Sequence, residues 1–142
     1  MNREIKFRAW NTDRKKMITS FDGITQNSIG DSTTHNLRLL SSSYSGADMF
    51  RPNWGRNVIL MQYTGLRDKN GVEIYEGDII KNIQADVNEV FWYNEEPSFC
   101  YRNYHAEALP LGCDSNATME GELFTQDEVI GNIYENPELL NQ

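Results

Sequence analysis

The sequence predicts an all-β fold, and three observations support this prediction. Short segments rich in Val, Ile and aromatic residues recur along the second half of the 142-residue chain, as β-strands require. Glycine-containing turns separate these segments every several residues, which favours a small barrel or a sandwich. The three Trp, seven Tyr and six Phe residues exclude disorder throughout the chain, because so much ring area is rarely left in water.

The first element expected is an N-terminal β-hairpin arm over residues 1–19. The side chains of Ile5–Trp10 alternate strictly between the two faces of an extended segment. This pattern is typical of a half-buried strand. The alternation places Ile5 on the core face with Phe7 and Ala9, and it leaves Trp10 on the other face. A polar turn follows, so Met17–Thr19 can return antiparallel to the first strand.

Residues 20–57 have a different composition. Ser, Thr, Asn, Asp and Gly dominate this segment, and no hydrophobic period is sustained. We expect a polar, partly irregular excursion with one short element around Leu37–Leu40.

The remaining residues, 58–142, are expected to form a small β-barrel domain. The apolar run Val58–Tyr63 predicts a central strand buried on both faces. Asn70-Gly71 predicts a type I′ hairpin, because both residues tolerate positive φ. Further strands are expected at residues 72–75, 79–83, 88–93, 98–104 and 128–134, followed by a terminal turn at 137–140.

Charge is distributed unevenly along the chain. Residues 1–71 carry 11 basic and 6 acidic side chains, whereas residues 72–142 carry 2 and 15, within a total net charge of −8. The N-terminal hairpin combines five cations with an aromatic ring that can stack on a nucleic-acid base. This candidate binding patch comprises Lys6, Arg8, Trp10, Arg14, Lys15 and Lys16.

These cations are expected to face acidic groups of their own chain or of a neighbouring subunit. Nucleic acid is the less favoured partner, because a net charge of −8 repels it at long range. The aromatic residues between Phe91 and Tyr104 lie among glutamates. We interpret them as core rings, some of them exposed at a protein interface.

No motif predicts catalysis, a metal site or a cofactor. His35, Cys100, His105 and Cys113 lack the spacing of paired metal ligands, and two histidines leave a Ser or Cys nucleophile with few bases. The chain opens with charged residues, and its longest apolar run is far too short to cross a bilayer. We therefore expect a cytoplasmic protein that is not an enzyme and has no membrane partner.

Three blocks of sequence occur in order along the chain: Arg3–Trp10, Leu60–Ile80 and Val129–Leu139. Together they closely resemble the signature of the YopX family, small proteins encoded by bacteriophages and prophages. The resemblance implies a β-rich phage protein in the bacterial cytoplasm, with a small SH3-like barrel in its second half. It brings no established activity, cofactor or binding site.

The middle block contains the residue types that tight turns need. Gly65, Gly71 and Gly77 are expected at three successive chain reversals, and Asn70 is the second residue of the predicted hairpin turn. Asp78 can accept a hydrogen bond from a local backbone N–H. We interpret the block as a structural turn motif, with a ligand-binding loop as the alternative.

The expected function is that of a non-enzymatic interaction module of phage origin that forms a homo-oligomer. The polarised charge and an edge-prone hairpin both favour contacts between copies. One alternative is a phage accessory protein that binds nucleic acid through the basic hairpin. A second is an acidic inhibitor or mimic that binds a host protein through the second half of the chain.

Overall fold

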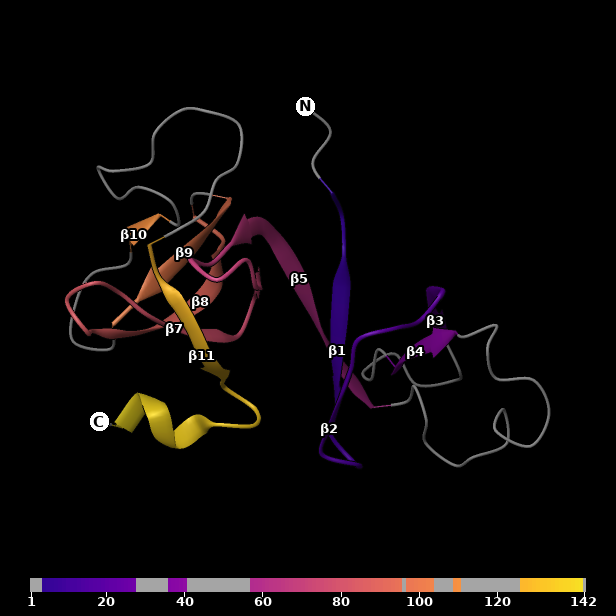
Figure 1. The fold of residues 1–142 in the computed structure, drawn as a ribbon. Coiled ribbons are helices and arrows are strands. Elements are labelled where there is room, and N and C mark those ends of the chain that lie inside the picture. Colours follow the sequence, from indigo (N-terminus) through magenta and orange to yellow (C-terminus); the bar gives the residue numbers. More distant parts are fainter. Residues whose placement is uncertain are drawn as a thin grey trace. The chain divides into compact units, whose positions relative to one another are not determined.

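The computed structural model describes residues 4–27, 36–40, 57–95, 97–103, 109–110 and 126–141. Their regular structure is almost entirely antiparallel β (Figure 1), which confirms the predicted fold class. The chain divides into two units. Unit 1 comprises residues 1–6 and 62–142, and unit 2 comprises residues 7–61.

The expected N-terminal hairpin is present in unit 2. Strand β1 (Phe7–Asn11) pairs antiparallel with β2 (Lys16–Ile18). The buried Asn11 holds the connecting turn, because its Oδ1 accepts the backbone N–H groups of Asp13 and Arg14 at 3.1 and 2.8 Å. Such side-chain bonds explain why a polar turn ends the strand at this point.

The two faces of β1 differ from the predicted alternation. Ala9 and Trp10 are neighbours, and both are buried, with Trp10 only 6% exposed. β1 lies inside a four-stranded sheet, between β2 and β5 (Val58–Arg67), with β6 (Glu73–Tyr75) on the far side of β5. It is covered on both faces here. Ile5, predicted to be buried, is exposed. Local alternation could not reveal a second covered face, because that depends on segments distant in sequence.

A second hairpin lies within residues 20–57. Strand β3 (Gly23–Asn27) pairs antiparallel with β4 (Asn36–Leu40). β4 confirms the short element expected there, whereas β3 has no sustained hydrophobic pattern and was not predicted. Leu39 is buried in a core cluster with Ala9 and Val58. The rest of the predicted excursion, residues 28–35 and 41–56, lies outside the described residues.

Strand β5 (Val58–Arg67) continues from unit 2 into unit 1. It is central, as predicted, with β1 on one side and β6 (Glu73–Tyr75) on the other. The prediction that both of its faces are buried holds at Val58 on one face and at Met61 and Tyr63 on the other, but it is wrong at Ile59, which is 39% exposed. The core cluster of unit 2 includes Val58 but not Ile59.

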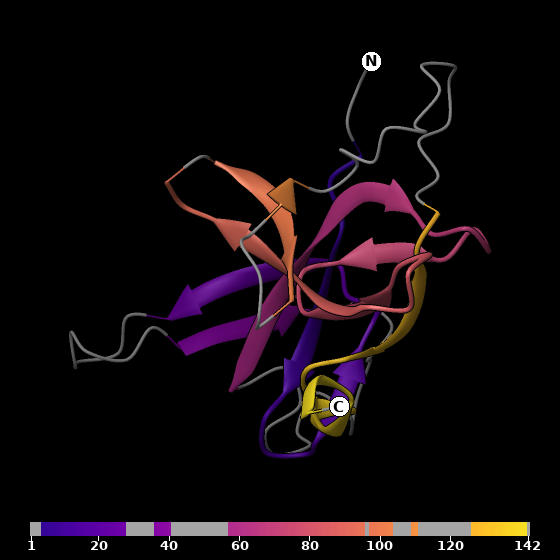
Figure 2. The ribbon, with the colours of Figure 1, turned by 90° about the vertical axis from the view of Figure 1, so that its left-hand side faces the viewer.

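Unit 1 contains a five-stranded antiparallel sheet that curls into half a barrel (Figures 1 and 2). Its order is β10-β9-β8-β7-β11, and a short 3-10 helix η2 (Pro137–Asn141) follows β11. Its strands are β7 (Asp78–Lys81), β8 (Val87–Tyr93), β9 (Ser98–Arg102), β10 (Leu109–Pro110) and β11 (Glu128–Asn132). Its core cluster consists of Ile74, Ile80, Val90 and Tyr101, with Leu66 and Val129 packed against it.

Two turns of unit 1, Asp68–Val72 and Asn82–Asp86, share one hydrogen-bond pattern. In each turn, the backbone N–H of the first residue donates to the C=O of the fifth, and the side chain of the first residue accepts the N–H of the fifth. The C=O of the first residue accepts the N–H of the fourth. The fourth residue is left-handed: Gly71 has φ 82° and Ala85 has φ 70°. Because Asn70 has no positive φ, the predicted type I′ turn is wrong. The loop instead has three residues with a left-handed glycine at its end.

Replacing Ala85 by Gly should stabilise the protein. The exposed Ala85 sits in the left-handed conformation that Gly71 occupies without strain, so Ala85→Gly should raise the free energy of unfolding by about 0.5–1 kcal/mol. Urea denaturation measures the change. The matched control is Gln84→Gly, an exposed neighbour without positive φ, which should lose stability. A destabilising Ala85→Gly would contradict the turn geometry.

Candidate functional site

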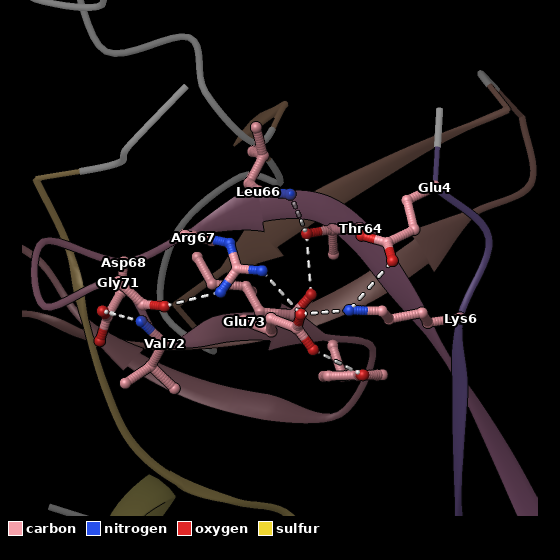
Figure 3. A network of polar contacts seen from close by, with 11 residues as sticks. Glu4, Lys6, Thr64, Leu66, Arg67, Asp68, Gly71, Val72 and Glu73 are labelled. Atoms are coloured by element: carbon pink, nitrogen blue, oxygen red, sulfur yellow. Dashed lines mark hydrogen bonds and ion pairs between the residues drawn. The ribbon is translucent and has the colours of Figure 1, made fainter. Parts of the chain in front are cut away.

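A polar network on β5 and β6 centres on the carboxyl group of Glu73. Its Oε1 accepts hydrogen bonds from Lys6 Nζ at 2.5 Å and from Arg67 Nη2 at 2.8 Å, and its Oε2 accepts the Tyr75 hydroxyl at 3.0 Å. Lys6 also pairs with Glu4 at 3.2 Å. Figure 3 shows Lys6 and Arg67 reaching Glu73 from opposite sides. The network therefore ties the entering N-terminal segment and β5 to β6.

The electrostatics of this network favour its charged form. The hydrogen bond from Lys6 lowers the pKa of Glu73, and the same bond raises the pKa of Lys6. The Tyr63 ring lies 5.6 Å from Lys6 Nζ, and burial raises the pKa of its hydroxyl. Lys6 and Glu73 are thus charged at neutral pH, and their opposite charges offset each other within unit 1.

Asp68 binds the β5–β6 turn to β11. This residue is completely buried. Its Oδ1 accepts the backbone N–H groups of Asn70 at 2.8 Å and Val72 at 2.9 Å, and its Oδ2 accepts the N–H of Val129 at 3.0 Å. One carboxyl group therefore satisfies three backbone donors from two segments that are far apart in sequence.

The other residues of the predicted turn motif are placed as follows. Gly71 and Gly77 lie at chain reversals with φ of 82° and 81°. Asp78 Oδ2 accepts the Tyr75 N–H at 2.8 Å, as expected for a local turn bond. Gly65 lies inside β5, at a register irregularity, so its predicted place at a chain reversal is wrong. A positive φ of 91° explains why glycine is needed there.

The predicted basic patch is divided between the two units. Lys6 belongs to unit 1 and binds Glu73. In unit 2, Arg8 is half-buried and Trp10 is buried, so the Trp10 ring is not open to stack on a base. The exposed part of the patch is Arg14–Lys16, at the end of the turn between β1 and β2 and the start of β2, which we call the basic turn.

The end of the β8–β9 hairpin carries aromatic rings on both faces. Trp92 stacks edge-on against Phe99, with ring centroids 4.9 Å apart, and Phe91 packs against Tyr93 at 6.2 Å. Trp92 is 36% exposed. We call residues 91–95 and 97–99 the aromatic tip. The sequence predicted core rings with some of them exposed. Phe99 and Tyr101 are buried whereas Trp92 is exposed, and alternation places neighbouring rings on opposite faces.

The candidate metal ligands and cysteines lie partly within the described residues. Among them, no group of three or more His, Cys, Asp or Glu side chains is placed to hold a metal ion. Cys100 is buried and is not in a disulfide. Three other candidates, His35, His105 and Cys113, lie outside the described residues, as does Tyr104.

Membrane insertion was the other possibility addressed from the sequence. In the part of the chain that the structure describes, no helix has both the length and the apolar character needed to cross a membrane.

Comparison with known proteins covers almost the whole chain. A family model described as YopX protein matches residues 6–141. The chain belongs to the YopX family. The crystal structure of protein EF1440 from Enterococcus faecalis is similar, with 29% identity and a TM-score of 0.55, over 98% of this chain and 99% of that one. Protein yopX from Bacillus subtilis is similar at 25% identity and a TM-score of 0.54, over 94% of each chain.

No curated protein matches the chain. The YopX family match begins at Lys6 and ends at Asn141, the last residue of η2. It therefore includes Lys6, Arg67 and Glu73 of the polar network, the basic turn and the aromatic tip. The YopX fold is therefore shared along the chain and is not confined to its middle block.

Proposed function

We propose that this YopX-family chain is a non-enzymatic interaction module that associates with further copies of itself. The observation that carries the proposal is the separation of charge between its two units. Unit 2 exposes the basic turn, Arg14–Lys16, at the end of a hairpin. Unit 1 is strongly acidic, and opposite charges on different parts of one molecule favour contacts between unlike surfaces of two copies.

The cations of unit 1 do not offset its acidic excess. Residues 1–6 and 62–142, which make up unit 1, contain 17 acidic and 6 basic side chains. The cations that the structure describes in unit 1 are engaged mostly by carboxylates of the same unit. These ion pairs are Lys6–Glu73, Arg67–Glu73, Lys69–Glu128 and Arg102–Glu89. The remaining carboxylates give unit 1 a field that attracts a basic surface.

The setting that we propose is a bacterial cytoplasm, with a phage or prophage as the source of the chain. Two observations support this setting: the sequence blocks resemble a phage-encoded family, and the two similar solved proteins come from Enterococcus faecalis and Bacillus subtilis.

Sedimentation velocity at two salt concentrations tests the self-association. We expect the native chain to assemble in about 50 mM salt and to dissociate in about 500 mM salt, where charges are screened within a few ångströms. Reversing the basic turn with Lys15→Glu plus Lys16→Glu should leave a monomer at both. The control is Lys81→Glu, an exposed cation of unit 1, which should assemble normally. A native chain that stays monomeric at high concentration and low salt would refute self-association.

Binding to nucleic acid is the second candidate, and the three consecutive exposed cations of the basic turn favour it. A gel shift with duplex and single-stranded probes in about 50 mM salt tests it, because phosphate contacts are strongest at low ionic strength. Retardation that the double variant abolishes would support this candidate. Unretarded probes would end it.

The acidic unit 1 supports a third candidate, an inhibitor or mimic that binds a basic host protein. Pull-down from a host lysate should then recover cationic proteins that elute with salt. Recovery of neutral proteins only would count against this candidate.

A further inference from the structure

The end of the β8–β9 hairpin extends beyond the strands that flank it. β7 pairs with β8 only along Val87–Glu89, and β10 pairs with β9 only at Cys100 and Tyr101. Within the described residues, the aromatic tip is therefore a two-stranded ribbon, which Figure 2 shows as the orange hairpin projecting from the sheet. A ribbon of two strands has little independent stability, so its ring pairs must contribute to its order.

The rings of the tip have the character of a protein-binding surface. Trp92 and Phe99 face each other across the two strands, and Trp92 remains 36% exposed. Phe91 and Tyr93 lie on the opposite face of the ribbon. A rigid, partly exposed Trp supported by other rings is the type of residue that supplies most of the binding energy at protein interfaces.

The tip is suited to cationic side chains. Arg102 already places its guanidinium 4.4 Å from the centroid of the Phe91 ring. The exposed Glu95 accepts the Tyr93 hydroxyl at 2.7 Å, so a carboxylate lies beside the rings. Residues 86–101 contain no Lys or Arg. Rings beside a carboxylate attract Lys and Arg, whose apolar stems cover the ring while the charged group meets the carboxylate.

We infer that the aromatic tip of one copy receives the basic turn, Arg14–Lys16, of a second copy. This inference rests on the proposed self-association and names its two surfaces. The basic turn offers three consecutive exposed cations at the end of a narrow hairpin, and the tip offers exposed ring area with a carboxylate. Because the two surfaces differ, the contact is heterologous, and its repetition builds a ring or a linear assembly.

Complementation between two variants tests the pairing. Glu95→Lys alters the tip, whereas Lys15→Glu plus Lys16→Glu alters the basic turn. Each protein alone should remain monomeric in about 50 mM salt, since each lacks one surface. Their mixture should form a 1:1 complex, because the first retains a native turn and the second a native tip. Glu138→Lys, an equal charge change at another exposed site of unit 1, should assemble normally.

A second pair of variants tests the ring. Trp92→Ala should weaken assembly at least about tenfold, as removal of a central Trp does at interfaces. Ile83→Ala, which truncates another exposed apolar side chain of unit 1, should leave assembly unchanged. Equal unfolding midpoints for the variants would show that folding is intact.

The outcomes separate the inference from the proposed function. If reversal of the basic turn abolishes assembly while Glu95→Lys and Trp92→Ala assemble normally, the tip is not the receptor and the inference is overturned, although self-association stands. If the native chain does not assemble under any condition, the proposed function fails and the inference fails with it. Restored assembly in the mixture, together with weakened Trp92→Ala, supports both.

Discussion

Asp68→Ala should destabilise unit 1 by about 3–5 kcal/mol, because it removes the charged acceptor that three backbone N–H groups share. Asp68 is completely buried and accepts the backbone N–H groups of Asn70, Val72 and Val129. Alanine offers no acceptor in place of this completely buried carboxyl group. Urea denaturation, followed by Trp fluorescence, measures the loss.

Two further variants make this prediction specific. Asp68→Asn keeps the shape and one acceptor oxygen but directs an amide toward the Val129 N–H, so it should lose about 1–3 kcal/mol. Its amide exchange should rise most at Val129. The matched control is Asp86→Ala, an exposed carboxylate in the equivalent second turn, expected to change stability by less than about 0.5 kcal/mol. If Asp68→Ala matched this control, the triple hydrogen bond would not contribute as the geometry requires.

Gly131→Ala is the second large effect, with an expected loss of about 1–3 kcal/mol from overpacking. A Cβ at position 131 would lie 2.6 Å from Asn136 Oδ1 and 3.0 Å from Asn136 Cβ. The Asn136 side chain cannot simply rotate away, because its own Cβ is also too close. The same Oδ1 accepts the Asn132 N–H at 3.4 Å, so displacement also weakens the end of β11.

A double-mutant cycle isolates this clash. Asn136→Ala removes only a long hydrogen bond and should cost about 0.5–1 kcal/mol. For a Cβ at position 131, Asn136→Ala removes the Oδ1 and Cγ contacts at 2.6 and 2.9 Å but keeps the Cβ contact at 3.0 Å. In that background, adding Gly131→Ala should therefore cost less than it does alone, which gives a favourable coupling of about 1 kcal/mol. Chemical denaturation of the four proteins provides the measurement. Additive losses would show that the cost at Gly131 does not arise from Asn136.

Both predictions concern residues of the family blocks. Gly131 is explained by a residue five positions away, whereas Asp68 combines two local bonds with one to the distant Val129. Asn132 makes similar local bonds: its Oδ1 accepts the N–H groups of Tyr134 and Glu135 at 3.1 and 2.9 Å. Asn11 makes the equivalent pair of bonds in the β1–β2 turn. Side chains that fold back on the next few residues need no distant partner. Such turns can therefore be predicted from the sequence.

The candidate site was predicted only in part. The sequence predicted that Arg14–Lys16 lie at the polar turn of the N-terminal hairpin, because a polar run separates two strand segments. Their exposure is a finding of the structure. Lys6 and Trp10 were grouped with that turn because they share its hairpin, but each has its own contacts. Lys6 binds Glu73, which lies 67 residues away in sequence, and Trp10 is buried. The local sequence pattern indicates neither the bond of Lys6 to Glu73 nor the burial of Trp10.

By itself, the sequence determined the mainly β fold, the two hairpins β1–β2 and β8–β9, the closing strand β11 and the reversals at Gly71 and Gly77. These features depend on side-chain alternation and on backbone preferences that act within about four residues. Only the tertiary structure decided that both Ala9 and Trp10 are buried, that Ile59 is exposed and that Asp68 holds a distant strand. Burial of a strand face and satisfaction of a buried carboxyl group depend on non-local neighbours, and no short window of sequence contains them.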